Sequence, residues 1–264
     1  MCFSISGGGG LMRIRSDDGR GVLDGEGHLA RRLALLPAAA RVLDVGGGRA
    51  PCRRANVVMD AVSYEAVRNA GGLAGMCLAP DAWIQRDICD RTSWPFPDKA
   101  FDFAVCTHVL EDVRDPVWVC REMSRVAKAG YVVTPSRHVE QSLGVENPCY
   151  AGYYHHRWLI ESKDGELVFR HKPHLLHSRA EAIVARLDAF HQIRPELATV
   201  EIEWRDAIRA REELEFDERR TVEELQAFAR KARRIEGLVV RRREPIRVSL
   251  RRLIYYSRLR LARP

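Results

Sequence analysis

Residues 43–50, LDVGGGRA, place an acid near the end of an apolar run and follow it with three consecutive glycines. The run that enters this turn, residues 40–45, is short and β-branched, which predicts a buried strand. Glycines after a strand let the backbone approach a ligand where a Cβ atom would clash. Turns of this kind occur in phosphate, dinucleotide and nucleoside sites alike.

Neighbouring residues narrow the choice among these three kinds of site. A dinucleotide fingerprint needs glycine at the third position of GxGxxG, but Pro51 stands there after Gly46 and Gly48. A Walker phosphate loop ends in GK[ST], which is absent here. The turn thus lacks the fingerprints of a dinucleotide site and of a Walker phosphate loop.

Predicted strands and helices alternate around this turn. Residues 28–37 and 115–130 have helical apolar spacing, and the second of these segments begins with an aspartate followed by proline and ends in glycine. Further strands are predicted at residues 56–60, 82–87, 101–109 and 130–136. Alternation at this spacing predicts an α/β fold with a doubly wound, mostly parallel sheet and right-handed crossovers.

The pattern changes after about residue 150. Residues 157–161 and 167–171 flank KDGE, which predicts an antiparallel hairpin with Asp164 and Gly165 at its turn. A helix over residues 179–190, a strand over residues 199–204 and a charged helix over residues 221–235 are predicted to follow. The parallel sheet thus has a C-terminal antiparallel hairpin and a helical extension.

Four motifs in order resemble the class I S-adenosylmethionine-dependent methyltransferases. The first is the acid followed by x-G-x-G at Asp44, Gly46 and Gly48, and the most specific is WPFPDKAFDFAVCTHVLEDVRDP at residues 94–116. The resemblance covers residues 40–136 and implies a Rossmann-like methyltransferase fold that uses S-adenosyl-L-methionine. Residues 49–55 depart from the family's long first helix, because they are too few, and a loop or single turn is expected there.

The resemblance also implies which residues hold the cofactor. Asp60, which ends the second strand, occupies the family's ribose-binding position, and Asp87 with Ile88 occupies its adenine position. The carboxyl end of the fourth strand is expected to face the methionyl portion, because ligands of open α/β sheets bind beyond this edge. The cofactor-binding residues are thus expected to be Asp44, Gly46, Gly47, Gly48, Asp60, Asp87, Ile88, Cys106, Thr107 and His108. Cys106 fits core packing equally well, and Glu111 with Asp112 fits an exposed pair at a helix start.

Residues 137–178 are expected to form a lid over the acceptor. Within this lid His155 and His156 are the candidate catalytic residues, since histidine is a common general base near neutral pH. If the segment is a strand, only one of two adjacent histidines can face the cleft. A structural role beside Trp158 is the alternative. No metal site is predicted, because the seven cysteines include no CxxC pair.

The net charge of +7 is concentrated at the C-terminus. Residues 241–264 hold nine arginines and one glutamate, interleaved with leucines, whereas the rest of the chain is close to neutral. We expect a flexible leader at residues 1–26, a methyltransferase domain at residues 27–240 and this basic, amphipathic tail. The tail fits a helix docked on the body or on a partner protein, a peripheral membrane contact or, less well, RNA.

The expected acceptor is a small molecule or a glycan, and nucleic acid is not expected. The absence of a DPPY-type or NPPY-type motif disfavours methylation of an exocyclic base nitrogen. The alternative function is a degenerate or purely cofactor-binding Rossmann-like module that the tail directs to a membrane surface, RNA or a partner protein. No apolar run approaches the length of about 20 residues that a spanning helix needs, so a cytoplasmic location is expected. The oligomeric state is not predicted.

Overall fold

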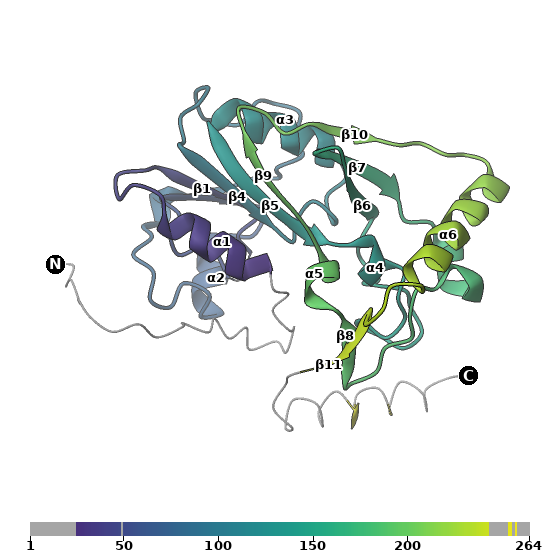
Figure 1. Cartoon of the computed structure of the whole chain (residues 1–264). Coiled ribbons are helices and arrows are strands. Elements are labelled where there is room, and N and C mark those ends of the chain that lie inside the picture. The colour runs from purple at the N-terminus through teal and green to yellow at the C-terminus, as the bar shows by residue number, and fades with distance from the viewer. Residues whose placement is uncertain (1–24, 49, 243–252, 255–256, 258–264) are drawn as a thin grey trace.

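The centre of the fold is a six-stranded sheet in the order β3-β2-β1-β4-β5-β9 (Figure 1). The computed structural model describes residues 25–48, 50–242, 253, 254 and 257. The strands of this sheet are β1 (Val42–Val45), β2 (Val57–Asp60), β3 (Trp83–Gln85), β4 (Phe103–Thr107), β5 (Ala129–Pro135) and β9 (Thr199–Arg205). Strands β1 to β5 pair in parallel, and β9 pairs antiparallel to β5. This topology confirms the predicted mostly parallel α/β sheet.

Helices α1 (Gly25–Ala34) and α3 (Pro116–Val126) cover opposite faces of the sheet. Successive side chains of a strand point to opposite faces, so Val42 packs in the cluster that contains α1 and its neighbour Leu43 packs in the cluster that contains α3. Figure 1 shows α1 crossing in front of β4 and β5. The sheet is therefore covered on both faces, as a parallel sheet requires.

Helix α3 begins as predicted but ends earlier. The side chain of Asp115 accepts a hydrogen bond from the backbone N–H of Trp118, and Pro116 takes the first helical position. The predicted end at Gly130 is wrong, because this glycine lies inside β5. A Cβ atom at Gly130 would come within 2.2 Å of the carbonyl oxygen of Ala104, so the glycine permits close pairing of β4 and β5.

The connection from β1 to β2 contains no helix among its described residues, which confirms the predicted loop. The backbone N–H of Cys52 donates to Oδ2 of Asp44 at 2.6 Å, which turns the chain back toward the sheet. Helix α2 (Tyr64–Asn69) follows β2 and begins at an N-cap, Ser63, whose side chain accepts from the backbone N–H of Ala66.

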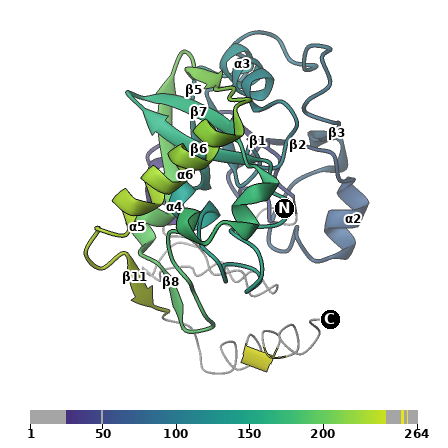
Figure 2. The same cartoon turned by 90° about the vertical axis from the view of Figure 1, so that its right-hand side faces the viewer.

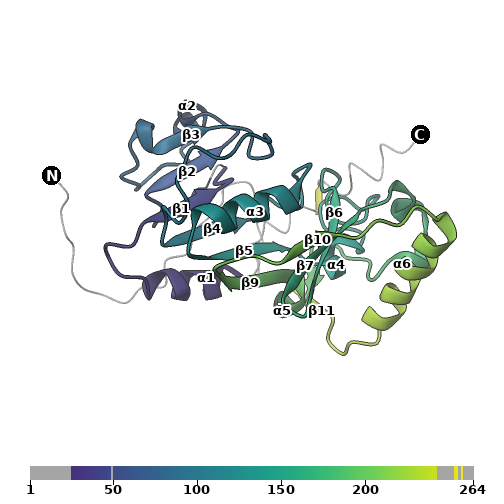
Figure 3. The ribbon, with the colours of Figure 1, turned by 90° about the horizontal axis from the view of Figure 1, so that it is seen from above.

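Most of the chain after β5 gathers at one end of the parallel sheet, whereas β9 returns to pair with β5 (Figure 3). Figure 3 shows β6, β7, α4 and α6 gathered at one end of the molecule, and Figure 2 shows α6 crossing in front of β6 and β7. The predicted hairpin is confirmed, with positive φ at both Asp164 and Gly165 in its turn. The elements of this part are α4 (Arg137–Glu140), β6 (Trp158–Lys163), β7 (Glu166–His171), β8 (His191–Ile193), α5 (Pro195–Ala198), β10 (Ala210–Glu212), α6 (Glu218–Ala232) and β11 (Val239–Arg241). Strand β10 pairs parallel to β7, and β11 pairs antiparallel to β8.

The helix predicted over residues 179–190 is wrong. Only a 3-10 turn, Ala180–Ala182, forms there, and the backbone that follows is extended beside residues 141–143. The N–H of Leu143 donates to the carbonyl of Ala185, and the N–H of Leu187 donates to the carbonyl of Leu143. These bonds to a distant segment replace the bonds that a helix would make internally.

Most of the basic tail, residues 241–264, lies outside the described residues, and so does nearly all of the leader, residues 1–26. The expectations for both segments therefore stay predictions. Every helix in the described part of the chain is too short or too polar to cross a membrane.

Candidate functional site

The turn after β1 is bonded to the end of β2. The N–H of Gly46 donates to the carbonyl of Met59, and the N–H of Gly48 donates to Oδ2 of Asp60 at 2.7 Å. The other carboxylate oxygen of Asp60, Oδ1, accepts from the N–H of Val62 at 2.7 Å. Gly46 and Gly48 both have positive φ, which L side chains rarely adopt. The structure thus brings the glycine turn and Asp60 together, as predicted.

The three glycines differ in what surrounds them. A Cβ atom on Gly46 would lie 2.4 Å from Cγ2 of Val109, and one on Gly47 would lie 2.7 Å from Oδ2 of Asp44. The nearest atom to a Cβ on Gly48 would be the carbonyl oxygen of Gly46, at 3.8 Å. Internal packing therefore explains the first two glycines, and only Gly48 has open space on its Cβ side.

This difference gives a test. We expect Gly46→Ala to lower the free energy of unfolding by about 2 kcal/mol, because it adds a clash to the strain of a positive φ. Gly48→Ala should cost only about 1 kcal/mol, from strain alone. Urea denaturation of both variants measures the two values, and equal losses would contradict this account of the turn.

Asp44 is buried below the turn. Burial raises the pKa of its carboxyl to about 7. The hydrogen bond from the Cys52 N–H opposes this rise in pKa, and the charge of Asp60 adds to it. An acid that titrates near neutrality at the end of a strand is typical of a functional site.

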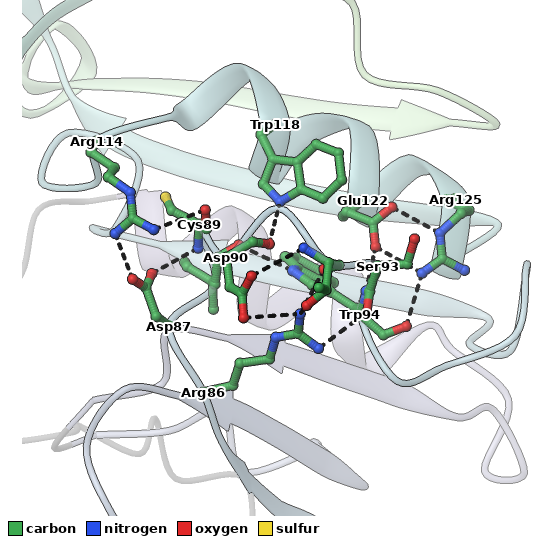
Figure 4. A network of polar contacts seen from close by, with 12 residues as sticks. Arg86, Asp87, Cys89, Asp90, Ser93, Trp94, Arg114, Trp118, Glu122 and Arg125 are labelled. Carbon is green, nitrogen blue, oxygen red and sulfur yellow. Dashed lines mark hydrogen bonds and ion pairs between the residues drawn. The ribbon is translucent and has the colours of Figure 1, made fainter.

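Asp87 follows β3 and is exposed, with Ile88 buried beside it. Its Oδ2 lies 2.5 Å from Nη1 of Arg114, and its Oδ1 accepts from the N–H of Cys89 at 2.9 Å (Figure 4). The pKa of Asp87 is lowered, chiefly by the hydrogen bond from Arg114. The indole N–H of Trp94 donates to the carbonyl of Ile88, so the backbone of this segment is held in place. Sequence reasoning missed Arg114.

The three residues at the end of β4 have different surroundings. Cys106 is fully buried in the core, and burial raises the pKa of its thiol well above the usual value, which fits core packing. Thr107 is half-buried. His108 has positive φ, its N–H donates to the carbonyl of Val133, and its side chain is 36% exposed. Only Thr107 and His108 therefore remain open at this edge.

The expected exposed pair at a helix start is wrong for the helix and for Glu111, whereas the side chain of Asp112 is 40% exposed. Helix α3 begins after both residues, and Glu111 is 1% exposed. Within the described residues neither carboxylate oxygen of Glu111, nor Oδ1 of Asp112, has a hydrogen-bond partner. The cause of this burial is the approach of β6: the N–H of Arg157 donates to the carbonyl of Glu111, and the indole of Trp158 donates to the carbonyl of Val113.

The same approach places both histidines at Asp112. Nε2 of His155 and Nε2 of His156 each lie 3.8 Å from Oδ1 of Asp112. Strand β6 begins only at Trp158, so the histidines lie in a turn and do not alternate as in a strand. The expectation that only one of them can face the site is therefore wrong.

His156 is also bonded to a buried acid that sequence reasoning missed. Its Nδ1 lies 2.8 Å from Oε1 of Glu140, and Oε2 of Glu140 lies 2.6 Å from Nζ of Lys172. Burial alone would lower the pKa of His156, but the hydrogen bond to Glu140 and nearby carboxylates raise it overall. A Cβ atom on Gly152 would come within 2.3 Å of Oε2 of Glu140, so this glycine makes room for the carboxylate.

Comparison with known proteins shows similarity to one family and to individual proteins. Residues 26–176 match the sequence profile of a family described as "Methyltransferase domain". A curated relative, ajmaline N-methyltransferase of Rauvolfia serpentina, is 34% identical over 82 residues, which are 31% of this chain and 28% of the relative. The YcgJ protein of Bacillus subtilis is 24% identical, with 41% of this chain and 50% of that chain covered and a TM-score of 0.33.

A second solved structure extends further along the chain. The S-adenosylmethionine-dependent methyltransferase of Mesorhizobium loti is 16% identical, with 56% of this chain and 64% of that chain covered and a TM-score of 0.35. The chain thus spans 28% of the curated relative's length. The matched profile, in contrast, extends over more than half of this chain and includes the glycine turn, the ends of β2 to β4 and the histidine pair. The chain belongs to this family of methyltransferase domains.

Proposed function

We propose that the chain transfers a methyl group from S-adenosylmethionine to a small-molecule or glycan acceptor. The observation that supports this most strongly is the joining of Gly48 to Asp60 at the carboxyl edge of a parallel sheet, in a chain of this family. The curated relative's name describes methylation of a nitrogen of ajmaline, which favours an acceptor of small size.

The residues at this edge fit the cofactor. Gly48 has open space on its Cβ side, so a ligand can approach its backbone. Each oxygen of Asp60 accepts one backbone hydrogen bond, and a carboxylate oxygen has a second lone pair for a ribose hydroxyl. Asp87, which accepts a hydrogen bond from Arg114, likewise keeps lone pairs that can accept hydrogen bonds from the adenine. The turn itself would be shaped by the packing of Asp44, Gly46 and Gly47. The edge of the cofactor site would be lined by Ile88, Thr107 and His108.

When bound, S-adenosylmethionine supplies a methyl group on a positively charged sulfur, and the carbon–sulfur bond breaks as a lone pair of the acceptor forms the new bond. The chain itself has to align the acceptor, exclude water and receive any proton that the acceptor loses. We assign acceptor handling to the segment after β5, residues 137–178, because its histidines His155 and His156 lie 3.8 Å from Asp112, in the loop that follows β4.

Cofactor binding is tested by calorimetry with S-adenosylmethionine and S-adenosylhomocysteine. Asp60→Ala should weaken binding by about 1.5 to 3 kcal/mol, the range for hydrogen bonds to a charged group. Asp98→Ala is the control, because Asp98 pairs with Arg125 and precedes β4, at the amino edge of the sheet.

Thermal unfolding of both variants reports any damage to the fold separately. Absence of binding to the unaltered protein would refute the proposed function, and an unchanged affinity in Asp60→Ala would assign the ribose to another residue. Binding without turnover on any acceptor would favour the alternative, a cofactor-binding module.

A further inference from the structure

We propose that Asp112, His155 and His156 bind one divalent transition-metal ion of the Zn²⁺ type. One ligand atom from each of the three side chains lies within 4.8 Å of those of the other two. The three residues come from two segments, the loop after β4 and the turn before β6, which are joined through the Arg157–Glu111 backbone bond. The cluster is thus a product of the fold and not of one flexible loop.

The distances suit a common ion. Two ligands that each lie about 2.1 Å from one ion can be at most about 4.2 Å apart, and about 3.4 Å apart in tetrahedral geometry. Both histidine Nε2 atoms lie 3.8 Å from Oδ1 of Asp112, between these limits. The ligand atoms of the two histidines lie within 4.8 Å of each other, and rotation of the more exposed ring, His155, would bring any excess over about 4.2 Å within reach of one ion.

The surroundings of His156 fit a metal ligand. Metal-binding histidines commonly use their second ring nitrogen to donate to a carboxylate, which orients the ring and leaves the other nitrogen free for the ion. Nδ1 of His156 lies 2.8 Å from Oε1 of the fully buried Glu140. Nζ of Lys172, which is also buried, lies 2.6 Å from Oε2 of Glu140 and neutralises its charge. Glu140 therefore already has a cationic partner.

Two other carboxylates do lack a strong partner. Oδ1 of Asp112 and both oxygens of Glu111 are buried without a hydrogen bond in the described part of the chain. Among those residues, the basic groups within 4.0 Å of Glu111 and Asp112 are all histidines. Glu111 is buried, whereas the side chain of Asp112 is 40% exposed, so the buried and unbonded Oδ1 of Asp112 is the atom that a divalent cation would satisfy.

The donor set indicates the class of ion. Two imidazoles and one carboxylate suit zinc and neighbouring transition metals, whereas Mg²⁺ prefers oxygen ligands alone. Three protein ligands leave a coordination position open, as in catalytic zinc sites. That an acceptor oxygen or nitrogen takes this position rests on the proposed function, but binding of the ion does not.

The test uses the full chain without a histidine tag, freed of metal by dialysis against a chelator. Calorimetry with Zn²⁺ alone should give one site, and Co²⁺ should give the visible absorption of a nitrogen-ligated ion. Asp112→Asn and His155→Gln should each weaken Zn²⁺ binding at least about 10-fold. A loss of that size is already typical when a residue that only hydrogen-bonds to a metal ligand is replaced. Both positions are partly exposed, so the variants should fold.

The matched control is His191→Gln, which removes a histidine outside the cluster that is paired with an acid, Asp188, at 2.9 Å. Its Zn²⁺ affinity should equal that of the unaltered protein. The proposal would be overturned if Asp112→Asn bound Zn²⁺ as tightly as the unaltered protein does, or if the unaltered protein bound Mg²⁺ more tightly than Zn²⁺. S-adenosylmethionine binding, measured on the same samples, separates this outcome from failure of the proposed function.

Discussion

Replacing Arg137 by alanine should lower the free energy of unfolding by about 3 to 5 kcal/mol, the range for removing one partner of a buried ion pair. Arg137 begins α4, directly after β5, and its side chain is 2% exposed. Its guanidinium makes a bidentate pair with Glu224 of α6, with distances of 2.5 and 2.7 Å, and lies 3.0 Å from Glu161 of β6. The guanidinium also stacks 4.2 Å above the ring of Phe228.

These contacts make Arg137 the link between the parallel sheet, the hairpin and α6. Arg170 also contacts Glu224, so the acid keeps one cationic partner in the variant and the loss should not exceed this range. For a chain of this length the loss corresponds to a fall in melting temperature of about 6 to 20 °C.

The control for Arg137→Ala is Arg219→Ala, on the same helix that Arg137 contacts. Arg219 pairs with Glu223 at 2.9 Å, but its side chain is 87% exposed, so the change should be about 0.5 kcal/mol or less. Urea denaturation of the two variants measures both values. Equal, small losses would show that α6 is held by its apolar side chains and not by the buried arginine.

The parallel half of the fold was predictable because its signals are local. The glycine turn after β1, the N-cap and proline that start α3, and the apolar runs of β2 and β4 each lie within a few residues of the structure that they specify. Asp60 could be placed beside the glycine turn for the same reason, since parallel neighbours bring their carboxyl ends to one edge.

The part after β5 depends on contacts between distant residues, which periodicity does not report. Residues 183–187 bond to residues 141–143, and this pairing defeats the helical pattern of their side chains. Glu140 meets His156 and Lys172 only because three separate segments converge on it. A buried acid looks the same in sequence as a solvated one, so the convergence of Asp112, His155 and His156 could not be predicted from the residues before the structure placed them.

Substituting Asp44 by asparagine should make the stability of the protein less dependent on pH. Burial raises the pKa of Asp44 to about 7 from an ordinary value of 3.8, so the folded protein binds a proton that the unfolded chain releases between these values. A raised pKa in the folded state contributes stability that is fully present below about pH 4 and is lost as the pH rises through 7. Above pH 7 the free energy of unfolding is lower by on the order of 4 kcal/mol, since each unit of pKa difference corresponds to 1.36 kcal/mol.

Urea denaturation of both proteins from pH 4 to pH 8 measures this difference. Asparagine keeps an oxygen for the Cys52 N–H but carries no charge, so the variant should match the unaltered protein near pH 4 and exceed it in stability at pH 8. Parallel curves across this range would show that the carboxylate is ionised in the folded protein without penalty.

The same variant tests why a destabilising acid stands at this position. Functional sites often retain groups that lower the stability of the fold. If Asp44 serves the cofactor, whose sulfonium and ammonium groups are cationic, Asp44→Asn should gain stability at pH 8 and lose affinity for S-adenosylmethionine. Affinity for S-adenosylhomocysteine, which lacks the sulfonium charge, should fall less. A variant that is more stable and binds both compounds as tightly as before would assign Asp44 to the turn alone. Its role there would be to accept the hydrogen bond from the Cys52 N–H and to fill the space in which a side chain at position 47 would lie.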